Sequence, residues 1–460
     1  MVRIVDLEEL DLRAELGDDG RISRVLDQRG NEMGLVAAKT DPLTGGISLT
    51  AGGVQNLSFG RRRGFRAVVF GDSFTARNTS AGETARLLDH GYFSWANAFL
   101  GGAFSLIANA GVSGQRTDEM LARIESDVIA RDPDWVFVQG GWNDINAGYT
   151  SQAVIDTLTA ICSMLSSRGI NVVLLAVAPN NSVTAGIARK LHIINKGLRE
   201  YAFSTGGVYF VDTYAAVVDP TSATAAFASL MSSDGTHLSA YGARAYGKAI
   251  SDVLGEVVQS YNYLPSSNAE SYGVDSSSKQ IIDNPLLIGT GSAPTGTGAS
   301  GNLATGWAGG TGGSGASSAA FSLVARSDGK GNNQRIVVSG AAASSSINIR
   351  QTGLVSRATN GDVLYAVGEV TISGASDVRS VNLGGSATVG GVTYQLNTLE
   401  ANGASVNPDQ SSFTLQLRTP EFTIPAGSLT TVQFVVSATF GTTGTGALTM
   451  EIGRCGLYKK

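Results

Sequence analysis

A serine stands where an apolar run of strand length gives way to a segment that can be helical. The run ends in Val68-Val69-Phe70-Gly71-Asp72-Ser73, and its glycine lets the backbone bend sharply. A hydroxyl in such a turn is exposed and can act as a nucleophile if a base lies beside it. Asp and Ser are also ordinary turn and helix-capping residues, so this block alone leaves a structural role equally open.

A nucleophilic serine needs a general base, and the sequence offers three histidines, His90, His192 and His237. The first two fall in segments with helical patterns, where a place at the helix surface or the edge of the core is the better interpretation. His237 follows Asp234 by three residues. A carboxylate at that spacing can accept a hydrogen bond from the imidazole and fix its tautomer. We therefore expect Ser73 as nucleophile, His237 as base and Asp234 as the residue that orients the base.

Two further polar clusters follow apolar runs of strand length. Asn109-Ala110-Gly111-Val112-Ser113-Gly114 is a glycine-bearing loop whose backbone N–H groups can point toward the serine. Gly141-Trp142-Asn143-Asp144 supplies an amide that can donate to a developing oxyanion. An Asn-Asp turn that merely caps the next helix is an equally good interpretation of the second cluster taken alone.

These clusters need elements that bring them together. Short apolar runs alternate with segments of helical period, the pattern of a parallel sheet covered on both faces, whose ligands bind at the carboxyl ends of the strands. The predicted strands are Arg66–Gly71, Phe104–Asn109, Asp134–Gln139, Asn171–Val177 and Gly207–Asp212. The predicted helices are 82–100, 117–130, 151–168, 185–203 and 239–258.

Taken together and in order, the blocks resemble the SGNH (GDSL-type) hydrolase family over residues 65–260. The resemblance implies a flavodoxin-like, three-layer α/β/α fold and a catalytic triad of Ser73, Asp234 and His237. It also implies an oxyanion hole formed by the N–H groups of Ser73 and Gly114 and by the side chain of Asn143. The first block reads Ser-Phe where many members have Ser-Leu or Ser-Ile, and we expect Phe74 to alter the pocket wall more than the chemistry.

The implied reaction proceeds through an acyl-enzyme and calls for no metal or organic cofactor. The two cysteines, Cys162 and Cys455, form no ligand cluster with the histidines. A formal charge of -5 gives no broad positive field for nucleic acid. The N-terminus has no signal-peptide pattern, and no stretch reaches the ~20 apolar residues of a membrane span. A phage virion, or an extracellular site reached by a non-Sec route, remains open.

Composition divides the chain into four parts. We expect a β/loop lead-in at 1–60, the hydrolase domain at 61–262, a Gly/Ser-rich linker and loop region at 263–315, and a jelly-roll-like β-sandwich at 316–460. The sandwich would bind carbohydrate or, through its β-rich segments, assemble a homo-oligomer.

The substrate depends on these flanking parts. A β-module beside an esterase is typical of enzymes that act on polymers, because the second domain holds the chain near the site. Short pieces around residues 40–46 and 284–307 resemble phage tail-associated proteins. The first interpretation is removal of O-acetyl groups from a carbohydrate polymer, with Trp142 as a candidate substrate contact. A lipid or simple-ester hydrolase, or a non-catalytic glycan-binding or tail structural protein, are the alternatives.

Overall fold

The computed structural model describes residues 64–81, 83–258, 264–274, 277, 279–401 and 412–460. Before residue 64 it gives only the backbone of six strands, which form two antiparallel sheets of three strands each. These strands are β1 (Arg3–Leu7), β2 (Leu12–Leu16), β3 (Ile22–Asp27), β4 (Leu35–Thr40), β5 (Ile47–Ala51) and β6 (Leu57–Ser58). Among the described residues, no helix is both long and apolar enough to cross a bilayer.

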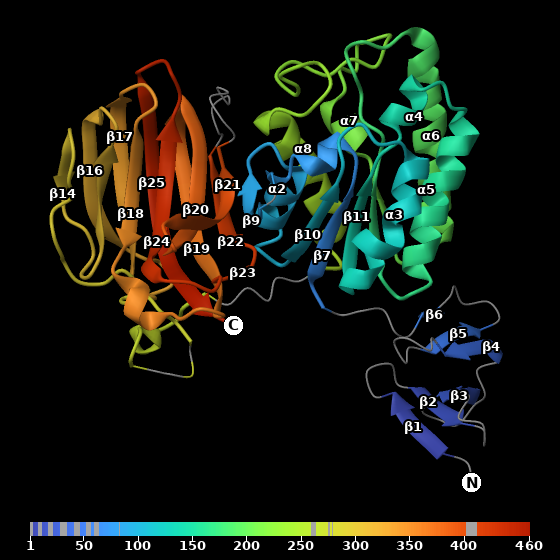
Figure 1. Cartoon of the computed structure of the whole chain (residues 1–460), viewed down its shortest axis with the longest axis horizontal. Helices are drawn as coiled ribbons and strands as arrows, with labels where there is room; N and C mark the ends of the chain where they lie inside the picture. Colours follow the sequence, from blue (N-terminus) through green and yellow to red (C-terminus); the bar gives the residue numbers. More distant parts are fainter. Residues whose placement is uncertain are drawn as a thin grey trace.

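A parallel sheet of five strands carries the first half of the chain (Figure 1). Its order is β10 (Ser105–Gly111), β7 (Arg66–Gly71), β11 (Trp135–Gln139), β12 (Asn171–Leu175) and β13 (Val208–Val211). The first strand of the domain, β7, therefore lies between the second and the third, which is the flavodoxin-like order. All five predicted strands are present, and the predicted fold class is confirmed.

The sheet is buried on both faces because successive side chains of each strand point in opposite directions. Val69 of β7 packs into one core, and Val68 and Phe70 pack into the other. The first core is closed by α2 (Tyr92–Phe99), α7 (Thr213–Val217) and α8 (Ala240–Leu254). The second is closed by α3 (Thr117–Asp127), α5 (Ser151–Ser166) and α6 (Ala185–Ser204).

The prediction of one helix over residues 82–100 is wrong in its first half. Residues 83–88 form strand β9 (Glu83–Leu88), which pairs with the short β8 (Thr79–Ser80), and only α2 is helical. The strand exists because β9 pairs in parallel with β21 (Val392–Glu400), some three hundred residues further along the chain. Pairing with a distant strand overrides local preference here.

The second half of the chain is a sandwich of two sheets, mostly antiparallel. One sheet has the order β14 (Ala299–Gly301), β16 (Ala316–Ala325), β17 (Asn332–Ala341), β25 (Gly446–Lys459), β19 (Val363–Ser376) and β22 (Phe413–Arg418), with β23 (Phe422–Thr423) beside β19. The other has the order β15 (Ala308–Gly312), β18 (Ser346–Gln351), β24 (Leu429–Phe440), β20 (Val378–Val389), β21, β9 and β8. The sandwich prediction is confirmed, while its jelly-roll connectivity stays a prediction.

The segment 263–315, expected as a linker, contributes to the sandwich. Its strands β14 and β15 pair with β16 and β18. Trp307 is buried and meets Phe434 edge to face, with ring centroids 5.8 Å apart. Its glycines permit close backbone contacts: a Cβ at Gly310 would lie 1.9 Å from the carbonyl oxygen of Thr295. Part of this Gly/Ser-rich stretch is therefore core, not a connection between domains.

The two halves share a continuous core where β9 joins the sandwich sheet (Figure 1). Trp95 of α2 packs edge to face on Phe413 of β22, with ring centroids 6.3 Å apart. Arg86 of β9 forms a two-point ion pair with Glu400 of β21. The β8–β9 hairpin is thus part of both halves.

Candidate active site

Ser73 stands at the carboxyl end of β7, as the first residue of the short helix α1 (Ser73–Ala76). Asp72 caps this helix by accepting a hydrogen bond from the N–H of Phe74 at 3.0 Å. A Cβ at Gly71 would lie 2.1 Å from the carbonyl oxygen of Gln139, so a larger residue could not sit this close to β11. The turn therefore presents the Ser73 hydroxyl above the sheet edge.

His237 reaches this hydroxyl from the turn before α8. Its Nε2 lies 2.8 Å from Oγ of Ser73. Its Nδ1 lies 2.9 Å from Oδ2 of Asp234, whose Oδ1 accepts hydrogen bonds from the backbone N–H groups of Thr236 and His237. The structure thus connects the three predicted side chains in one line, from hydroxyl to imidazole to carboxylate.

Asp234 is held in its ionised form. Partial burial raises the pKa of this carboxyl, but hydrogen bonds from the backbone and ring of His237 and from the N–H of Thr236 outweigh burial and bring the pKa well below its usual range. A carboxylate opposite Nδ1 favours the tautomer that carries its proton there, which leaves Nε2 able to accept the Ser73 proton. Arg77 also contacts Asp234, with 3.3 Å between Nη2 and Oδ2.

The turn that carries Asp234 and His237 is fixed by its own backbone. Gly235 has a φ of +78°, a conformation that L side chains rarely adopt, and its N–H donates to Oγ of Ser232. The Ser232 hydroxyl in turn donates to the carbonyl oxygen of His237. The carbonyl of Gly235 accepts from the N–H of Asn181 at 2.8 Å. The first two bonds fix the turn itself, and the third joins the turn of His237 to the loop that follows β12.

Phe74 packs against the predicted base. Its side chain is buried, and its ring lies against the imidazole of His237 with ring centroids 5.6 Å apart. This contact supports the orientation of the His237 ring, and an effect of Phe74 on the pocket wall stays a prediction.

The two expected oxyanion donors other than Ser73 follow neighbouring strands of the sheet, Gly114 on the loop after β10 and Asn143 on the helix after β11. Gly114 is exposed and has a φ of +83°. Asn143, half-buried at the start of α4 (Trp142–Asn146), donates from Nδ2 to the carbonyl oxygen of Gln115 at 2.8 Å. An amide nitrogen carries two N–H groups, so one remains for a ligand. Asp144 has the capping role, because its carboxylate accepts from the N–H and hydroxyl of Thr117.

The remaining candidates lie away from this line of contacts. Trp142 is half-buried and packs against the core under α3, α5 and α6, so its role as a substrate contact stays a prediction. His192 is exposed on α6 with its ring against Tyr214, as expected for a helix surface. His90 is buried in the turn between β9 and α2, where the sequence predicted a helix, and its Nδ1 lies 2.6 Å from Oδ1 of Asp89.

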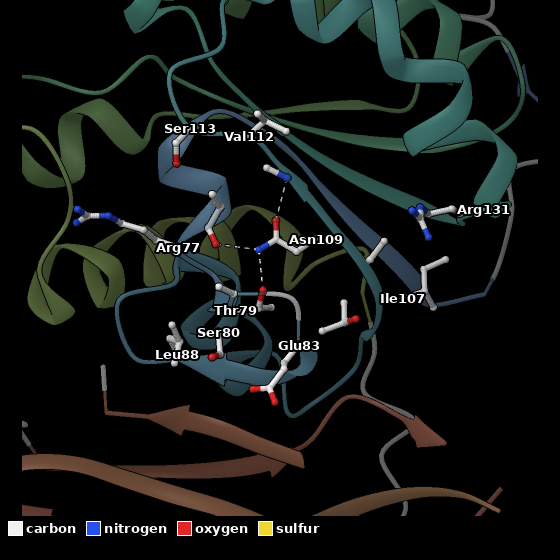
Figure 2. A pocket seen from close by; sticks show the side chains of 15 residues that line it. Arg77, Thr79, Ser80, Glu83, Leu88, Ile107, Asn109, Val112, Ser113 and Arg131 are labelled. Carbon is white, nitrogen blue, oxygen red and sulfur yellow. Dashed lines mark hydrogen bonds between the residues drawn. The ribbon is translucent and has the colours of Figure 1, made fainter. Parts of the chain in front are cut away.

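A cleft of about 860 Å³ that sequence reasoning missed adjoins these residues. Figure 2 shows it between β10 and the β8–β9 hairpin, with Arg77 and Ser113 at one end and Arg131 at the other. Asn109 shapes its floor by donating to the carbonyl of Ala76 and the hydroxyl of Thr79. The sequence indicates this cleft only through the position of Arg77, which lies one helical turn after Ser73 and lines the cleft.

No group of three or more metal-ligating side chains lies together within the described residues.

Residues 69–245 match the GDSL-like lipase/acylhydrolase family. No curated protein matches the sequence. Among solved structures, a catalytic variant of an acetylxylan esterase from Geobacillus stearothermophilus is 22% identical, with 42% of this chain and 94% of that chain covered and a TM-score of 0.36. A GDSL-like lipase from Bacteroides thetaiotaomicron is 20% identical, with 42% and 89% covered and a TM-score of 0.34.

The matched residues include Ser73 and His237, the end of β7 and the other four strands of the parallel sheet. The sandwich strands from β14 onward lie outside the match. Residues 69–245 of this chain are therefore similar to a GDSL-like lipase/acylhydrolase domain.

Proposed function

We propose that the protein is a serine esterase that removes O-acetyl groups from a carbohydrate polymer. The observation that carries the proposal is the chain of contacts from Ser73 Oγ through both ring nitrogens of His237 to Asp234, with 2.8 Å and 2.9 Å between the atoms. Distances of this kind are what a general base and its orienting carboxylate require.

In the proposed mechanism, Oγ of Ser73 attacks the ester carbonyl while its proton passes to Nε2 of His237. The imidazolium then gives this proton to the departing sugar oxygen as its bond to the carbonyl carbon breaks, and the acyl group stays on Ser73. Water then attacks the acyl group while His237 takes its proton, and His237 returns that proton to Oγ of Ser73 as the bond between Oγ and the acyl carbon breaks and the acid leaves. Asp234 remains ionised throughout and stabilises the imidazolium.

The negative charge of the tetrahedral intermediate needs donors that are already in position. We assign this role to the backbone N–H groups of Ser73 and Gly114 and to the amide of Asn143. The hydrogen bond from Asn143 to Gln115 supports the assignment, because it fixes the amide beside the loop that carries Gly114.

The carbohydrate substrate is supported by what surrounds the serine. The cleft beside it is lined by hydroxyl, amide and charged side chains as well as apolar ones, and it has no aromatic ring among its described lining residues. A lipid hydrolase would need a broad apolar groove for its acyl chain. The attached β-sandwich fits an enzyme that holds a polymer, and its assembly into an oligomer or a virion stays a prediction.

A non-catalytic glycan-binding or tail structural protein is the candidate of another class. It would have no need for a hydroxyl, an imidazole and an ionised carboxylate in contact. Keeping all three in hydrogen-bonding geometry favours the enzyme.

The test is acetate release from p-nitrophenyl acetate and from an O-acetylated polysaccharide by the wild type, Ser73→Ala and His237→Ala. His192→Ala, which removes an exposed imidazole from α6, is the matched control. We expect the first two variants to be folded and inactive and the control to keep its activity. A wild type that hydrolyses neither substrate would leave the binding protein as the better account, and activity on p-nitrophenyl acetate alone would favour a simple-ester hydrolase.

A further inference from the structure

The cleft that includes Arg77 and Ser113 begins at residues next to the proposed triad and oxyanion loop. Arg77 and Ser113 form its near end. Arg77 donates to Asp234, and Ser113 immediately precedes Gly114, so this end adjoins the triad and the oxyanion loop together. From there the cleft follows the open edge of β10 to Arg131 (Figure 2). Its volume of about 860 Å³ lies within the ~300–1,000 Å³ usual for ligand sites.

The lining offers groups that recognise hydroxyl-bearing ligands. Ser80, Thr84 and Ser113 contribute hydroxyls that both donate and accept, and none of the three is buried. Glu83 and Arg131 add a carboxylate and a guanidinium. Such a surface hydrogen-bonds a sugar chain, whereas an acyl chain would leave these groups without partners.

The wall opposite β10 is held by the C-terminal sandwich. Arg86 of β9 donates from Nε and Nη2 to the two carboxylate oxygens of Glu400, at 3.0 Å and 2.5 Å, and from Nη1 to Glu83 at 2.6 Å. The N–H of Asp89 donates to the carbonyl of Glu400 at 2.9 Å. The hairpin thus completes a sandwich sheet, and a change in β21 would move the wall of the cleft.

We propose that this cleft binds the sugar chain next to the acylated hydroxyl, and that the sandwich sets the shape of the cleft by holding the β8–β9 hairpin. The proposal rests on the proposed function of Ser73 as a carbohydrate deacylase. Binding energy from sugars in the cleft would be used at the ester, so kcat/KM rises with the number of sugars until the cleft is full.

The experiment measures kcat/KM for O-acetylated oligosaccharides of one to six sugars, built on xylose, glucose or N-acetylglucosamine, with p-nitrophenyl acetate as the substrate that is too short for the cleft. The sugar series on which the wild type is most active is then used for all variants. Circular dichroism and the Tm verify that each variant is folded.

The first variant is Arg131→Ala, at the far end of the cleft. Its matched control is Arg168→Ala, because both arginines donate to the carbonyl oxygen four residues earlier, Arg131 to Asp127 and Arg168 to Met164, each at 2.8 Å. Of these two arginines, Arg131 lines the cleft and Arg168 does not. We expect Arg131→Ala to lose about tenfold in kcat/KM on the longest oligosaccharide, as for a lost charged hydrogen bond. The control Arg168→Ala should stay within about twofold of the wild type on every substrate, and the loss in Arg131→Ala should grow with the number of sugars.

The second variant is Glu400→Gln, which weakens the hold on the hairpin. Glu421→Gln is its control, because Glu421 is an ion-paired carboxylate of similar exposure in the sandwich, 21% against 18%. The proposal predicts that Glu400→Gln reduces the gain in kcat/KM with sugar number and leaves p-nitrophenyl acetate unaffected. Glu421→Gln should leave both unchanged.

The outcomes separate the two proposals. If no oligosaccharide loses acetate while p-nitrophenyl acetate is hydrolysed, the carbohydrate function itself fails. If oligosaccharides are deacetylated but kcat/KM does not depend on their length, or Arg131→Ala behaves like Arg168→Ala at every length, the cleft is not the sugar subsite although the function stands. If Glu400→Gln behaves like Glu421→Gln, the sandwich does not set its shape.

Discussion

Two turns of this molecule place a histidine beside an aspartate, and they differ in what the second ring nitrogen meets. In the turn before α8, Nδ1 of His237 contacts Asp234 at 2.9 Å and Nε2 contacts the hydroxyl of Ser73. In the turn after β9, Nδ1 of His90 contacts Asp89 at 2.6 Å. Among the described residues, no side-chain hydroxyl or thiol is hydrogen-bonded to the other nitrogen of His90.

The two pairs also differ in their access to solvent. The side chain of His237 is 20% exposed and that of His90 only 5%. The backbone of Asp89 accepts from the indole of Trp95 and donates to Glu400, so this pair lies at the joint between the α/β half and the sandwich. A histidine–aspartate contact alone therefore does not make a catalytic site. It needs a nucleophile and access to a ligand.

The largest expected effect separates the two histidines. His237→Gln removes the proposed base and should lower kcat on p-nitrophenyl acetate by about 10⁴-fold to 10⁶-fold. His90→Gln should keep kcat within about threefold of the wild type, because no reacting group lies beside it. Comparable losses in two folded variants would contradict the distinction drawn between the pairs.

Substitution of the two aspartates should affect kcat as unequally as substitution of the two histidines. Asp234→Asn favours the wrong imidazole tautomer, and we expect kcat to fall about 10³-fold with the Tm nearly unchanged. Asp89→Asn should leave kcat near the wild-type value and lower the Tm. The contrast is checked by steady-state kinetics and thermal unfolding of the two variants side by side.

Asn143→Ala tests the proposed oxyanion donor on α4. Loss of one oxyanion donor should reduce kcat by about 10²-fold to 10³-fold. KM should change little, because the hydrogen bond forms with the developing charge. Asn146→Ala, an exposed asparagine at the end of the same helix, is the control. A rise in KM without a fall in kcat would show that Asn143 binds the ground state of the substrate instead.

Asp72 provides a pH-dependent effect next to the nucleophile. Burial raises the pKa of this carboxyl to about 7, although the N–H of Phe74 lowers it in part. The folded state thus holds the proton more tightly than the unfolded chain, whose carboxyl titrates near ~3.9. The stability that this proton contributes is complete below that value and is lost as pH rises toward 7.

We therefore expect the free energy of unfolding of Asp72→Asn, relative to the wild type, to rise by about 3 kcal/mol between pH 5 and pH 8. Urea unfolding at the two pH values measures this difference. A constant difference would mean that Asp72 is already ionised at pH 5.

The smallest expected effect is structural. His90→Gln should lower the free energy of unfolding by about 2 kcal/mol, because it disturbs a buried hydrogen bond. His192→Gln, at an exposed position, should change it by less than about 0.5 kcal/mol. Equal stabilities of the two variants would show that the Asp89–His90 contact contributes nothing at the joint.

The sequence predicts well what is encoded locally. Each strand of the parallel sheet contains a short apolar run, and Asp234 and His237 are close in sequence, so neither prediction depends on distant contacts. The contact between Phe74 and His237 could not be predicted in this way, because it joins α1 to a turn far along the chain. The same holds for the cleft, because one of its walls is formed by β9.

Strand β9 itself could not be predicted from its own residues. Its pairing with β21 and the ion pair between Arg86 and Glu400 join segments 314 residues apart. The glycines of β15 are typical of a linker when the sequence is taken alone. In the folded molecule, Gly309 and Gly310 instead leave room for the backbone of neighbouring segments, and those segments are distant in the sequence.

The most direct test of the central claim is covalent labelling with a fluorophosphonate, a reagent that reacts with an activated serine, followed by peptide mass spectrometry. The wild type should carry one adduct, on Ser73, and His237→Gln should react far more slowly while His90→Gln reacts like the wild type. An adduct on another serine, or equal labelling of the two histidine variants, would contradict the assignment of Ser73 and His237.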